Sequence, residues 1–319
     1  MSFMTPETPR PDRSPFNDNF RGVEMSEEDR FVGPKALELF TTTLIRPLPW
    51  EIKAGKIVVV KRFDQHVELE STPGIPYVPD LQERVIITQG LEKEVLSKEL
   101  SQALAIFKAV EDFLPDYMGR ATGMFRNNLG ISASYNQWGR EELQHSLALG
   151  LILERTGNKT AQQLVEEHQA NLLRTWELPF PTQRQMVLYA AFQERNTDLA
   201  YQALATQAEK EDAPITAKIL RIISKDEAYH GGGYRAFARI YYDLDQEGTI
   251  QDAVHVAANY RMPAQNLSPH PRSRATTLIK VGALSRAMIE RDTILHTLRG
   301  FRFIPEDVIR ETVRAFEKK

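Results

Sequence analysis

The pattern of apolar and polar positions along the chain changes near residue 80. Residues 55–70 (GKIVVVKRFDQHVELE) are rich in valine and alternate in polarity, which is typical of a strand. Beyond residue 80, apolar residues recur every three or four positions over long stretches, as expected for amphipathic helices. Short segments rich in Gly, Pro and Asn separate these stretches. The pattern therefore predicts an all-α fold that follows an irregular N-terminal segment.

The boundaries of the expected elements follow from these separating segments. A short helix is expected at about 34–43, and Ser71–Pro79, which holds three prolines, is expected to be a loop. The remaining helices are predicted at about 81–97, 98–121, 132–156, 159–174, 183–207, 214–243 and 248–260, with about two more in the tail from residue 265.

Three parts of the chain are expected to differ in organisation. Residues 1–30 are rich in Pro, Asp, Asn and Ser and are predicted to form a flexible arm. Residues 31–265 are predicted to form a helix bundle whose core begins near residue 80. Residues 266–319 are predicted to form a helical extension packed on the same domain.

Composition narrows the possible classes of protein. The 319 residues carry a net charge of −3, which argues against a general nucleic-acid binder. The chain has no cysteine, so it forms no disulfide, thiolate metal site or iron–sulfur cluster of its own. Its longest apolar runs, such as Leu147–Leu153, are shorter than the roughly 20 residues of a spanning helix. The first residues resemble neither a signal nor a transit peptide, and we expect a cytoplasmic protein.

Two Glu-x-x-His motifs carry the candidate chemistry. Of the seven histidines, His145 and His230 have a glutamate three residues earlier, at Glu142 and Glu227. Three residues is just under one helical turn, so both side chains of a pair emerge from the same helix face. Both pairs lie on the apolar stripe of their helix. Because a buried carboxylate without a partner costs several kcal/mol, each pair is predicted to bind a metal ion.

A single glutamate on the helix before each motif completes the pattern. In ferritin-like di-iron bundles, two helices each supply Glu-x-x-His and two others each supply one glutamate. Glu111 and Glu194 lie on apolar stripes, 31 and 33 residues before the glutamate of the next motif. The predicted metal ligands are Glu111, Glu142, His145, Glu194, Glu227 and His230.

The ligand types also select the metal. Four carboxylates balance two Fe²⁺ ions and leave a neutral site that can be buried. Imidazole and carboxylate suit iron or manganese, and the absence of thiolates disfavours a structural zinc site. We therefore expect two iron ions, cycling between Fe²⁺ and Fe³⁺, in each chain.

Four short strings around these residues resemble the soluble acyl-carrier-protein desaturases. They are EDFLPDY at 111–117, W-x-x-x-E-x-x-H at 138–145, FQERNT at 192–197 and DEAYH at 226–230, and Met262-Pro263-Ala264 also matches. The resemblance covers roughly residues 80–265. It implies a ferritin-like di-iron bundle with extra helices, assembled as a homodimer.

The resemblance also implies roles for two residues next to the ligands. Thr197, one turn after Glu194, would lie on the oxygen-binding side, and Asp226 would bridge to a histidine ligand on the electron route. The residues alone leave simpler interpretations open: a helical threonine often bonds a backbone carbonyl, and Asp226 adjoins the charged Lys225. For Trp138, core packing is the simpler interpretation.

Two features depart from the family. A buried tryptophan from an early helix normally completes the electron route, and the early tryptophan of this chain, Trp50, has a context that does not match. Gly231-Gly232-Gly233 directly follows a histidine ligand, although each mid-helix glycine costs roughly 1 kcal/mol relative to alanine. These glycines are predicted to mark close helix packing or an altered pocket.

The resemblance implies an O₂-dependent desaturase that places a double bond in a saturated fatty acyl chain carried on acyl carrier protein. The chain has no cysteine and no Gly-rich dinucleotide fingerprint, so a ferredoxin-type electron donor is implied. Seven basic residues could contact the acidic carrier, although each could equally be an ordinary solvated charge. They are Arg221, Lys225, Arg235, Arg239, Arg272, Arg274 and Lys280.

Two alternatives stay open from the sequence. A di-iron oxygenase could use the same ligands to hydroxylate a non-lipid substrate or to oxidise its nitrogen, and the shape of the pocket would separate the two reactions. A catalytically silent protein that holds iron or binds the carrier is the second alternative. A ribonucleotide-reductase radical subunit fits less well, because Leu149 stands where that class has a tyrosine after the first histidine.

Overall fold

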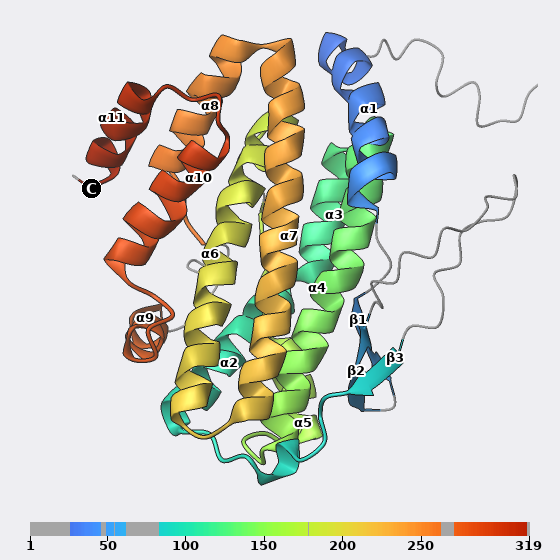
Figure 1. The fold of residues 1–319 in the computed structure, drawn as a ribbon, viewed down its shortest axis with the longest axis vertical. Helices are drawn as coiled ribbons and strands as arrows, with labels where there is room; N and C mark the ends of the chain where they lie inside the picture. Colours follow the sequence, from blue (N-terminus) through green and yellow to red (C-terminus); the bar gives the residue numbers. More distant parts are fainter. Residues whose placement is uncertain are drawn as a thin grey trace, which may run out of the picture.

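Four long helices pack together at the centre of the molecule (Figure 1). The computed structural model describes residues 26–45, 49–53, 55–61, 83–177, 179–262 and 271–317. Within these residues, the all-α prediction is confirmed. The four central helices are α2 (Lys98–Glu111), α4 (Leu129–Arg155), α6 (Gln183–Lys210) and α7 (Pro214–Leu244).

Capping residues set where the central helices begin. The side chains of Ser97, Asn128 and Thr182 each accept a hydrogen bond from a backbone N–H in the first turn of α2, α4 and α6. Helix α7 begins instead with Pro214, whose missing N–H costs nothing at a first helical position. The start of each central helix is therefore encoded locally.

Shorter helices surround the four central ones. Helix α1 (Glu27–Leu39) continues as a π-helical turn, η2 (Phe40–Leu44), beside α4 and α7. The tail was expected to hold about two helices, and its described residues form three helical segments. These are α9 (Pro271–Lys280), the π-helical η5 (Met288–Leu295) that runs into α10 (His296–Gly300), and α11 (Glu306–Glu317). The others are α3 (Leu114–Met124), α5 (Ala161–Asn171) and α8 (Gln246–Ala258).

Two predictions of helix extent are wrong. Residues 81–97 hold no α-helix in their described part: Glu83–Ile86 forms strand β3, and Leu91–Lys93 forms a short 3₁₀ turn after Gly90, whose φ is +91°. The predicted helix 98–121 is two helices that meet at Asp112 and Phe113. Pro115 lies in the first turn of the second helix, where its lack of an N–H ends any continuation of the first.

A small antiparallel sheet lies beside the lower half of α4 in Figure 1. It consists of β1 (Trp50–Lys53), β2 (Lys56–Lys61) and β3, in the order β1-β2-β3. The register places Trp50 opposite Val59, and the amide of Ile52 donates to the Gln144 side chain at 2.9 Å. The predicted strand at 55–70 is confirmed over β2, whereas its remainder, the predicted loop at 71–79 and residues 1–25 of the predicted arm lie outside the described residues.

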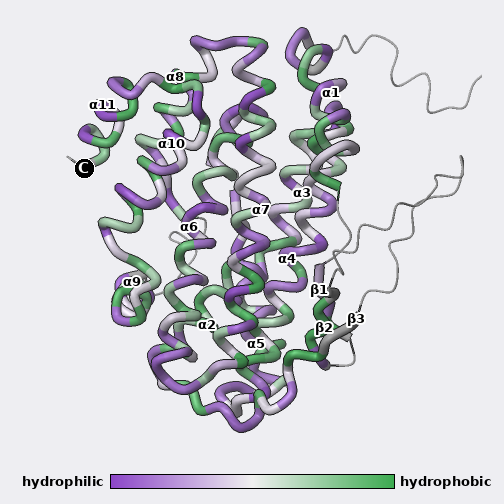
Figure 2. The backbone as a smooth tube through the Cα atoms, viewed as in Figure 1, coloured by the Kyte–Doolittle hydropathy of each residue, from purple (hydrophilic) through white to green (hydrophobic). Residues whose placement is uncertain are grey.

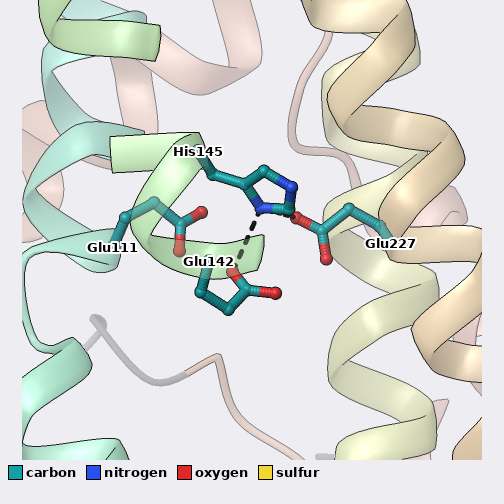
Figure 3. A group of neighbouring side chains, drawn as sticks. All are labelled: Glu111, Glu142, His145 and Glu227. Carbon is teal, nitrogen blue, oxygen red and sulfur yellow. Dashed lines mark hydrogen bonds and ion pairs between the residues drawn. The ribbon is translucent and has the colours of Figure 1, made fainter. Parts of the chain in front are cut away.

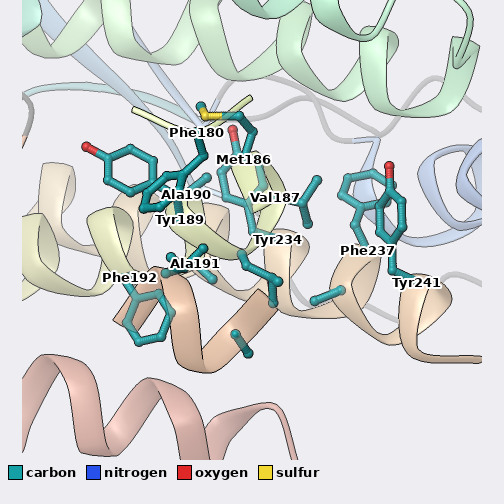
Figure 4. Close-up of a cluster of buried hydrophobic side chains, with 14 of the residues drawn as sticks. Phe180, Met186, Val187, Tyr189, Ala190, Ala191, Phe192, Tyr234, Phe237 and Tyr241 are labelled. Carbon is teal, nitrogen blue, oxygen red and sulfur yellow. The ribbon is translucent and has the colours of Figure 1, made fainter. Parts of the chain in front are cut away.

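Buried apolar side chains form two clusters, one above and one below the middle of the bundle. The upper cluster includes Phe192, Phe237 and Trp138, and Figure 4 shows the part of it in which side chains of α6 and α7 meet. The lower cluster includes Leu149 and Leu220. Ile294, Leu298, Phe301 and Ile309 of the tail belong to the upper cluster, while the division of the chain into arm, bundle and extension stays a prediction.

A layer of buried polar residues lies between these two clusters. Along α7, for example, Ile223 belongs to the lower cluster and Tyr234 to the upper one, with Asp226, Glu227 and His230 buried between them. Hydrophilic and hydrophobic residues alternate along the long helices in Figure 2, as expected for amphipathic helices. Within the described residues, none of the helices is sufficiently long and apolar to span a membrane.

Candidate metal centre

The six predicted ligands come together in the buried polar layer. Their residues are between 0% and 6% exposed, and they come from all four central helices. Their ligand atoms fall into two groups, and within each group the atoms lie no more than 4.8 Å apart. One group is Glu111, Glu142, His145 and Glu227, drawn in Figure 3, and the other is Glu142, Glu194, Glu227 and His230.

Glu142 and Glu227 belong to both groups. The two oxygens of Glu142 approach both histidines, with Oε2 at 3.2 Å from His145 Nδ1 and Oε1 at 3.1 Å from His230 Nδ1. Glu227 likewise lies 3.3 Å from His145 Nδ1 and 3.9 Å from His230 Nδ1. Two shared carboxylates with one further glutamate and one histidine on each side are the donor set of a dinuclear site.

Three buried ligand atoms favour metal ions as the missing partners. Oε1 of Glu142, Oε1 of Glu227 and Nδ1 of His230 have no hydrogen bond although each is fully buried. Glu142 Oε1 and His230 Nδ1 are 3.1 Å apart but are not aligned as a hydrogen bond, as expected for two atoms directed at a third. Because unpaired buried polar atoms are rare, the residues present fit metal binding.

The pKa values of the ligand residues also favour metal binding. Burial, followed by repulsion from neighbouring carboxylates, raises the pKa of Glu111 and of Glu194 well above the usual value. Burial opposes protonation of His145, but Glu142 and Asp226 outweigh it and raise the pKa of His145. Crowded carboxylates that resist ionisation are stabilised by a bound dication, so metal binding would relieve this repulsion.

Each outer glutamate ligand and Glu227 is held by a hydrogen-bonding side chain. The Tyr201 hydroxyl donates to Glu111 at 2.6 Å, and the Trp138 indole N–H donates to Glu194 at 3.1 Å. The Thr197 hydroxyl lies 3.1 Å from Glu227, and it is also within hydrogen-bonding distance of two backbone carbonyls of its own helix. Such contacts orient ligands around a metal.

The outer nitrogen of each histidine faces a carboxylate from the other motif's helix. His145 Nε2 lies 3.5 Å from Asp226, and His230 Nε2 lies 2.6 Å from Glu141. Asp226 and Glu141 each precede the glutamate of their own motif. The two motif helices therefore hold each other's histidine, which fixes the ring orientation and leaves Nδ1 directed at the cluster.

Trp50 extends the chain of contacts from His145 out of the bundle. Its indole N–H donates to Asp226 at 2.7 Å, and its ring is stacked on the His145 ring with centroids 6.1 Å apart and planes 11° apart. Trp50 is 2% exposed and stands on strand β1 rather than on an early helix. The early tryptophan of this chain therefore contacts both Asp226 and a predicted histidine ligand, although it lies on a strand and not on an early helix.

A small cavity of about 20 Å³ lies beside the other histidine, His230. The backbone carbonyl of Leu44, at the end of η2, accepts hydrogen bonds from the Gln137 and Tyr229 side chains and so closes this side. The cavity is lined by Leu44, Ser134, Gln137, Trp138, Tyr229, His230, Gly233 and Tyr234.

The structure brings the eight residues predicted for the site into one buried layer. The structure brings together the six ligands and sets Thr197 and Asp226 against them, while their roles stay predictions. Sequence reasoning missed the contacts of Tyr201 and Glu141 and took Trp138 as core packing. A usable signal existed for Glu141, since an acid precedes the motif glutamate in both halves.

The comparisons with known proteins agree with this geometry. The sequence profile of a family described as fatty acid desaturase matches residues 75–282. Acyl-[acyl-carrier-protein] desaturase 4, chloroplastic, from Oryza sativa subsp. japonica is 29% identical over 168 residues, which are 50% of this chain and 40% of that protein. The match thus spans less than half of the relative's length.

A solved structure has a similar fold. It is the X-ray structure of DesA2 from Mycobacterium tuberculosis H37Rv, described as a candidate acyl-ACP desaturase. It aligns with a TM-score of 0.54 and 19% identity, covering 69% of this chain and 78% of that one. Fold and site together define a ferritin-like helix bundle with buried carboxylate and histidine groups that could hold metal ions. The chain belongs to the fatty acid desaturase family.

Proposed function

We propose that the protein is an O₂-dependent desaturase of saturated fatty acyl chains carried on acyl carrier protein. Two C–H bonds on adjacent carbons break and a C=C bond forms. The two hydrogens, two further electrons and two further protons reduce one O₂ to two waters. The observation that carries this proposal is the convergence of two Glu-x-x-His motifs into one buried cluster in a chain of this family.

The six ligands would hold two iron ions, whose chemistry is the binding and reduction of O₂. The surrounding side chains would keep that chemistry selective. The apolar clusters above and below exclude water from the site. Thr197 would place a hydroxyl against Glu227, where it can hold or pass a proton on the oxygen side.

Electrons would enter on the Trp50 side from an acidic, ferredoxin-type donor. A surface cavity of about 410 Å³ lies over the end of this contact chain, lined in part by Val59, the cross-strand neighbour of Trp50. Lys218, Arg221 and Lys225 of α7 also line it, together with one acid, Glu209, that pairs with Arg221. The two lysines leave the cavity with an excess of positive charge. Complementary charge of this kind steers association with an acidic partner.

The acidic carrier would bind on the α9 side. Of the seven basic residues considered from the sequence, Arg221, Arg239 and Lys280 form ion pairs within the chain. Arg272 is exposed, and Arg274 is half-buried in a surface cavity of about 200 Å³ that also contains Lys159. Burial and repulsion from Arg174 lower the pKa of Arg274, so an acidic partner would be favoured there.

A homodimer is also proposed. On α6, apolar residues such as Ala190 and Ala205 are buried within the chain, where α8 and η5 pack on that helix. Leu143 and Leu147 of α4 are instead 46% and 47% exposed and one turn apart. Sedimentation that shows a monomer at micromolar concentration would contradict the dimer.

The reaction is tested by supplying the iron-loaded protein with O₂, ferredoxin, its reductase and acyl carrier proteins bearing saturated chains of different lengths. Product analysis by mass spectrometry should find chains that are two hydrogens lighter. If no chain gains a double bond while small amines or free acids are oxidised, the protein is an oxygenase of another substrate.

Carrier recognition is tested by reversing charge on α9. Arg272→Glu with Arg274→Glu should raise the half-saturating carrier concentration more than it slows turnover, and activity at low carrier should fall as salt rises. Arg126→Glu, an exposed arginine on another part of the surface, is the matched control. Equal effects of the two charge reversals would contradict the proposed carrier site.

A further inference from the structure

The proposed reaction gives no role to Arg235 of α7. Its side chain is half-buried, one turn beyond the ligand His230. Within the described residues, the guanidinium forms no ion pair or hydrogen bond, whereas Arg239 on the next turn pairs with Asp243. Partial burial of a cation that has no counter-ion costs free energy, because the group loses contacts with water and no ion pair or hydrogen bond replaces them.

Three glycines make room for this side chain. A Cβ atom on Gly231 would lie 3.4 Å from one terminal nitrogen of Arg235, and one on Gly232 would lie 3.9 Å from the other. On the opposite side, a Cβ on Gly300 of α10 would lie 3.1 Å from Arg235 Cδ. The guanidinium is therefore held between α7 and α10, and two of the three unexpected glycines after His230 line this slot.

Further donors surround the slot. Arg195 of α6 forms an ion pair with Asp198 at 2.6 Å and donates to the backbone carbonyl of Asp292. Arg302, just beyond α10, is exposed and has the left-handed φ of +60°. Burial, followed by repulsion from Arg195 and Arg302, lowers the pKa of Arg235.

His296 of α10 belongs to the same group. Burial and the two arginines Arg195 and Arg235 lower the pKa of its imidazole. The two carboxylates nearby are already engaged, because Asp198 accepts from Arg195, Ser224 and Gln202, and Asp292 pairs with Arg291. Arg195 is therefore balanced by Asp198, whereas Arg235 and Arg302 form no ion pair among the described residues.

We propose that Arg235, Arg195, Arg302 and His296 form a binding site for a phosphate-class oxyanion. A tetrahedral oxyanion can accept hydrogen bonds from several donors that approach from different directions, whereas a planar carboxylate is matched by one guanidinium fork. The site lies outside the metal cluster and does not depend on the proposed reaction. Its occupant is either free phosphate or the phosphate group of a larger molecule.

Calorimetric titration of the full-length protein with inorganic phosphate at constant ionic strength tests this site. The wild type should bind one phosphate per chain, and Arg235→Gln should weaken binding about tenfold or more, since a charge-assisted hydrogen bond is removed. Arg239→Gln, the exposed arginine one turn away, should bind as the wild type does. Equal binding by the wild type and Arg235→Gln would overturn the proposal.

Gly300→Ala tests the slot without removing any charge. The added methyl group should displace Arg235 and weaken phosphate binding several-fold, whereas Gly119→Ala, where a Cβ would meet nothing within 4 Å, should not. Both variants are checked for folding by circular dichroism. A second readout is the pKa of His296 by NMR, which should rise when phosphate binds and stay unchanged in Arg235→Gln.

Two further ligands identify the occupant. A sugar phosphate that binds more tightly than inorganic phosphate would assign the site to a phosphorylated molecule, and equal affinity would assign it to free phosphate. Binding of an acidic peptide in the absence of any phosphate binding would contradict the oxyanion site and indicate a protein contact instead.

Discussion

The two halves of the metal centre have the same ligands in the same order, but their outer surroundings differ. On the His145 side, the outer nitrogen leads through Asp226 to Trp50, a residue of the sheet outside the bundle. On the His230 side, the outer nitrogen meets Glu141, and a small cavity closed by Leu44 lies next to the ring. One half is connected by hydrogen bonds and ring stacking to the buried Trp50 of the sheet, and the other borders a small cavity.

This difference suggests that the two copies of the Glu-x-x-His motif have different roles. A buried hydrogen-bonded path suits the transfer of electrons, whereas a cavity of about 20 Å³ has room for one small molecule such as O₂. The three-residue spacing places the ligands in both halves, and elements from elsewhere in the chain decide what each half can do. The following variants test this difference in roles.

Replacing a shared ligand should have the largest effect, because it removes a donor from both halves at once. Glu227→Ala should abolish binding of both metal ions and all turnover, yet leave the bundle folded, since one of several crowded carboxylates is lost. Metal analysis and circular dichroism measure the two effects. Glu154→Ala, an exposed glutamate of α4, is the control, and retained turnover in Glu227→Ala would refute the site.

Trp50→Phe should affect the His145 half alone. The ring still stacks on His145, but the indole N–H that donates to Asp226 is lost. Metal content should stay at the wild-type level, while reduction of the oxidised centre slows roughly tenfold, the factor that 1.4 kcal/mol of barrier represents. Stopped-flow reduction measures this rate, with Trp176→Phe as control. An unchanged rate would remove Trp50 from the electron route.

Glu141→Gln should affect the His230 half alone. A neutral amide supports the imidazole less well than a carboxylate, and loss of such a support typically lowers metal affinity by about 10–100-fold. Titration of the metal-free protein with Fe²⁺ should therefore resolve one strong and one weakened site. Uniform weakening of both sites would show that the halves are not separable.

The pH dependence of the metal-free protein should involve both halves. Raised pKa values of Glu111 and Glu194 mean that stability falls as pH rises above the usual carboxyl value, about 4.5. The raised pKa of His145 adds stability below pH 6.5 that is lost as pH rises through its folded value. Urea unfolding should therefore give a falling free energy between about pH 5 and pH 8.

Bound iron should oppose this trend, whereas Glu227 should not contribute to it. The lowered pKa of Glu227 contributes stability that is lost only below about pH 4.5, so this contribution is constant between about pH 5 and pH 8. Iron requires deprotonated ligands, so the loaded protein should gain stability over the range in which the metal-free protein loses it. Parallel pH profiles for the two forms would contradict the ligand assignment.

The smallest effect is expected where the halves differ by one methyl group. The third residue after the histidine is Ala148 in one half and Gly233 in the other. A Cβ on Gly233 would meet Leu44 at an ordinary 3.5 Å, so Gly233→Ala should raise the unfolding free energy by about 0.5–1 kcal/mol. Ala148→Gly should lower it by a similar amount or more. Thermal and urea unfolding measure both changes.

The ligands could be predicted from the sequence because helical periodicity is a local property. Spacing places Glu142 and His145 on one face, and the apolar stripe shows that this face is buried. The supporting partners could not be found in this way, since Trp50 and Asp226 are 176 residues apart and Tyr201 and Glu111 are 90 apart. Tertiary packing alone brings such pairs together.

Pairing between distant parts of the chain also explains why the helix predicted over residues 81–97 is wrong. Glu83–Ile86 is a strand because β2 pairs with it, and β2 lies more than 20 residues earlier in the chain. The glycines after His230 give a further example. The sequence predicts close helix packing or an altered pocket at these glycines. In the structure, Gly231 and Gly232 lie against the side chain of Arg235, and Gly233 lies beside Leu44.

The two halves are proposed to hold one dinuclear iron centre between them. The most direct test is the metal content of the purified protein after growth with ample iron, measured together with a titration of the metal-free protein under anaerobic conditions. Two irons per chain are expected in both measurements. One zinc per chain, or no bound metal, would contradict it.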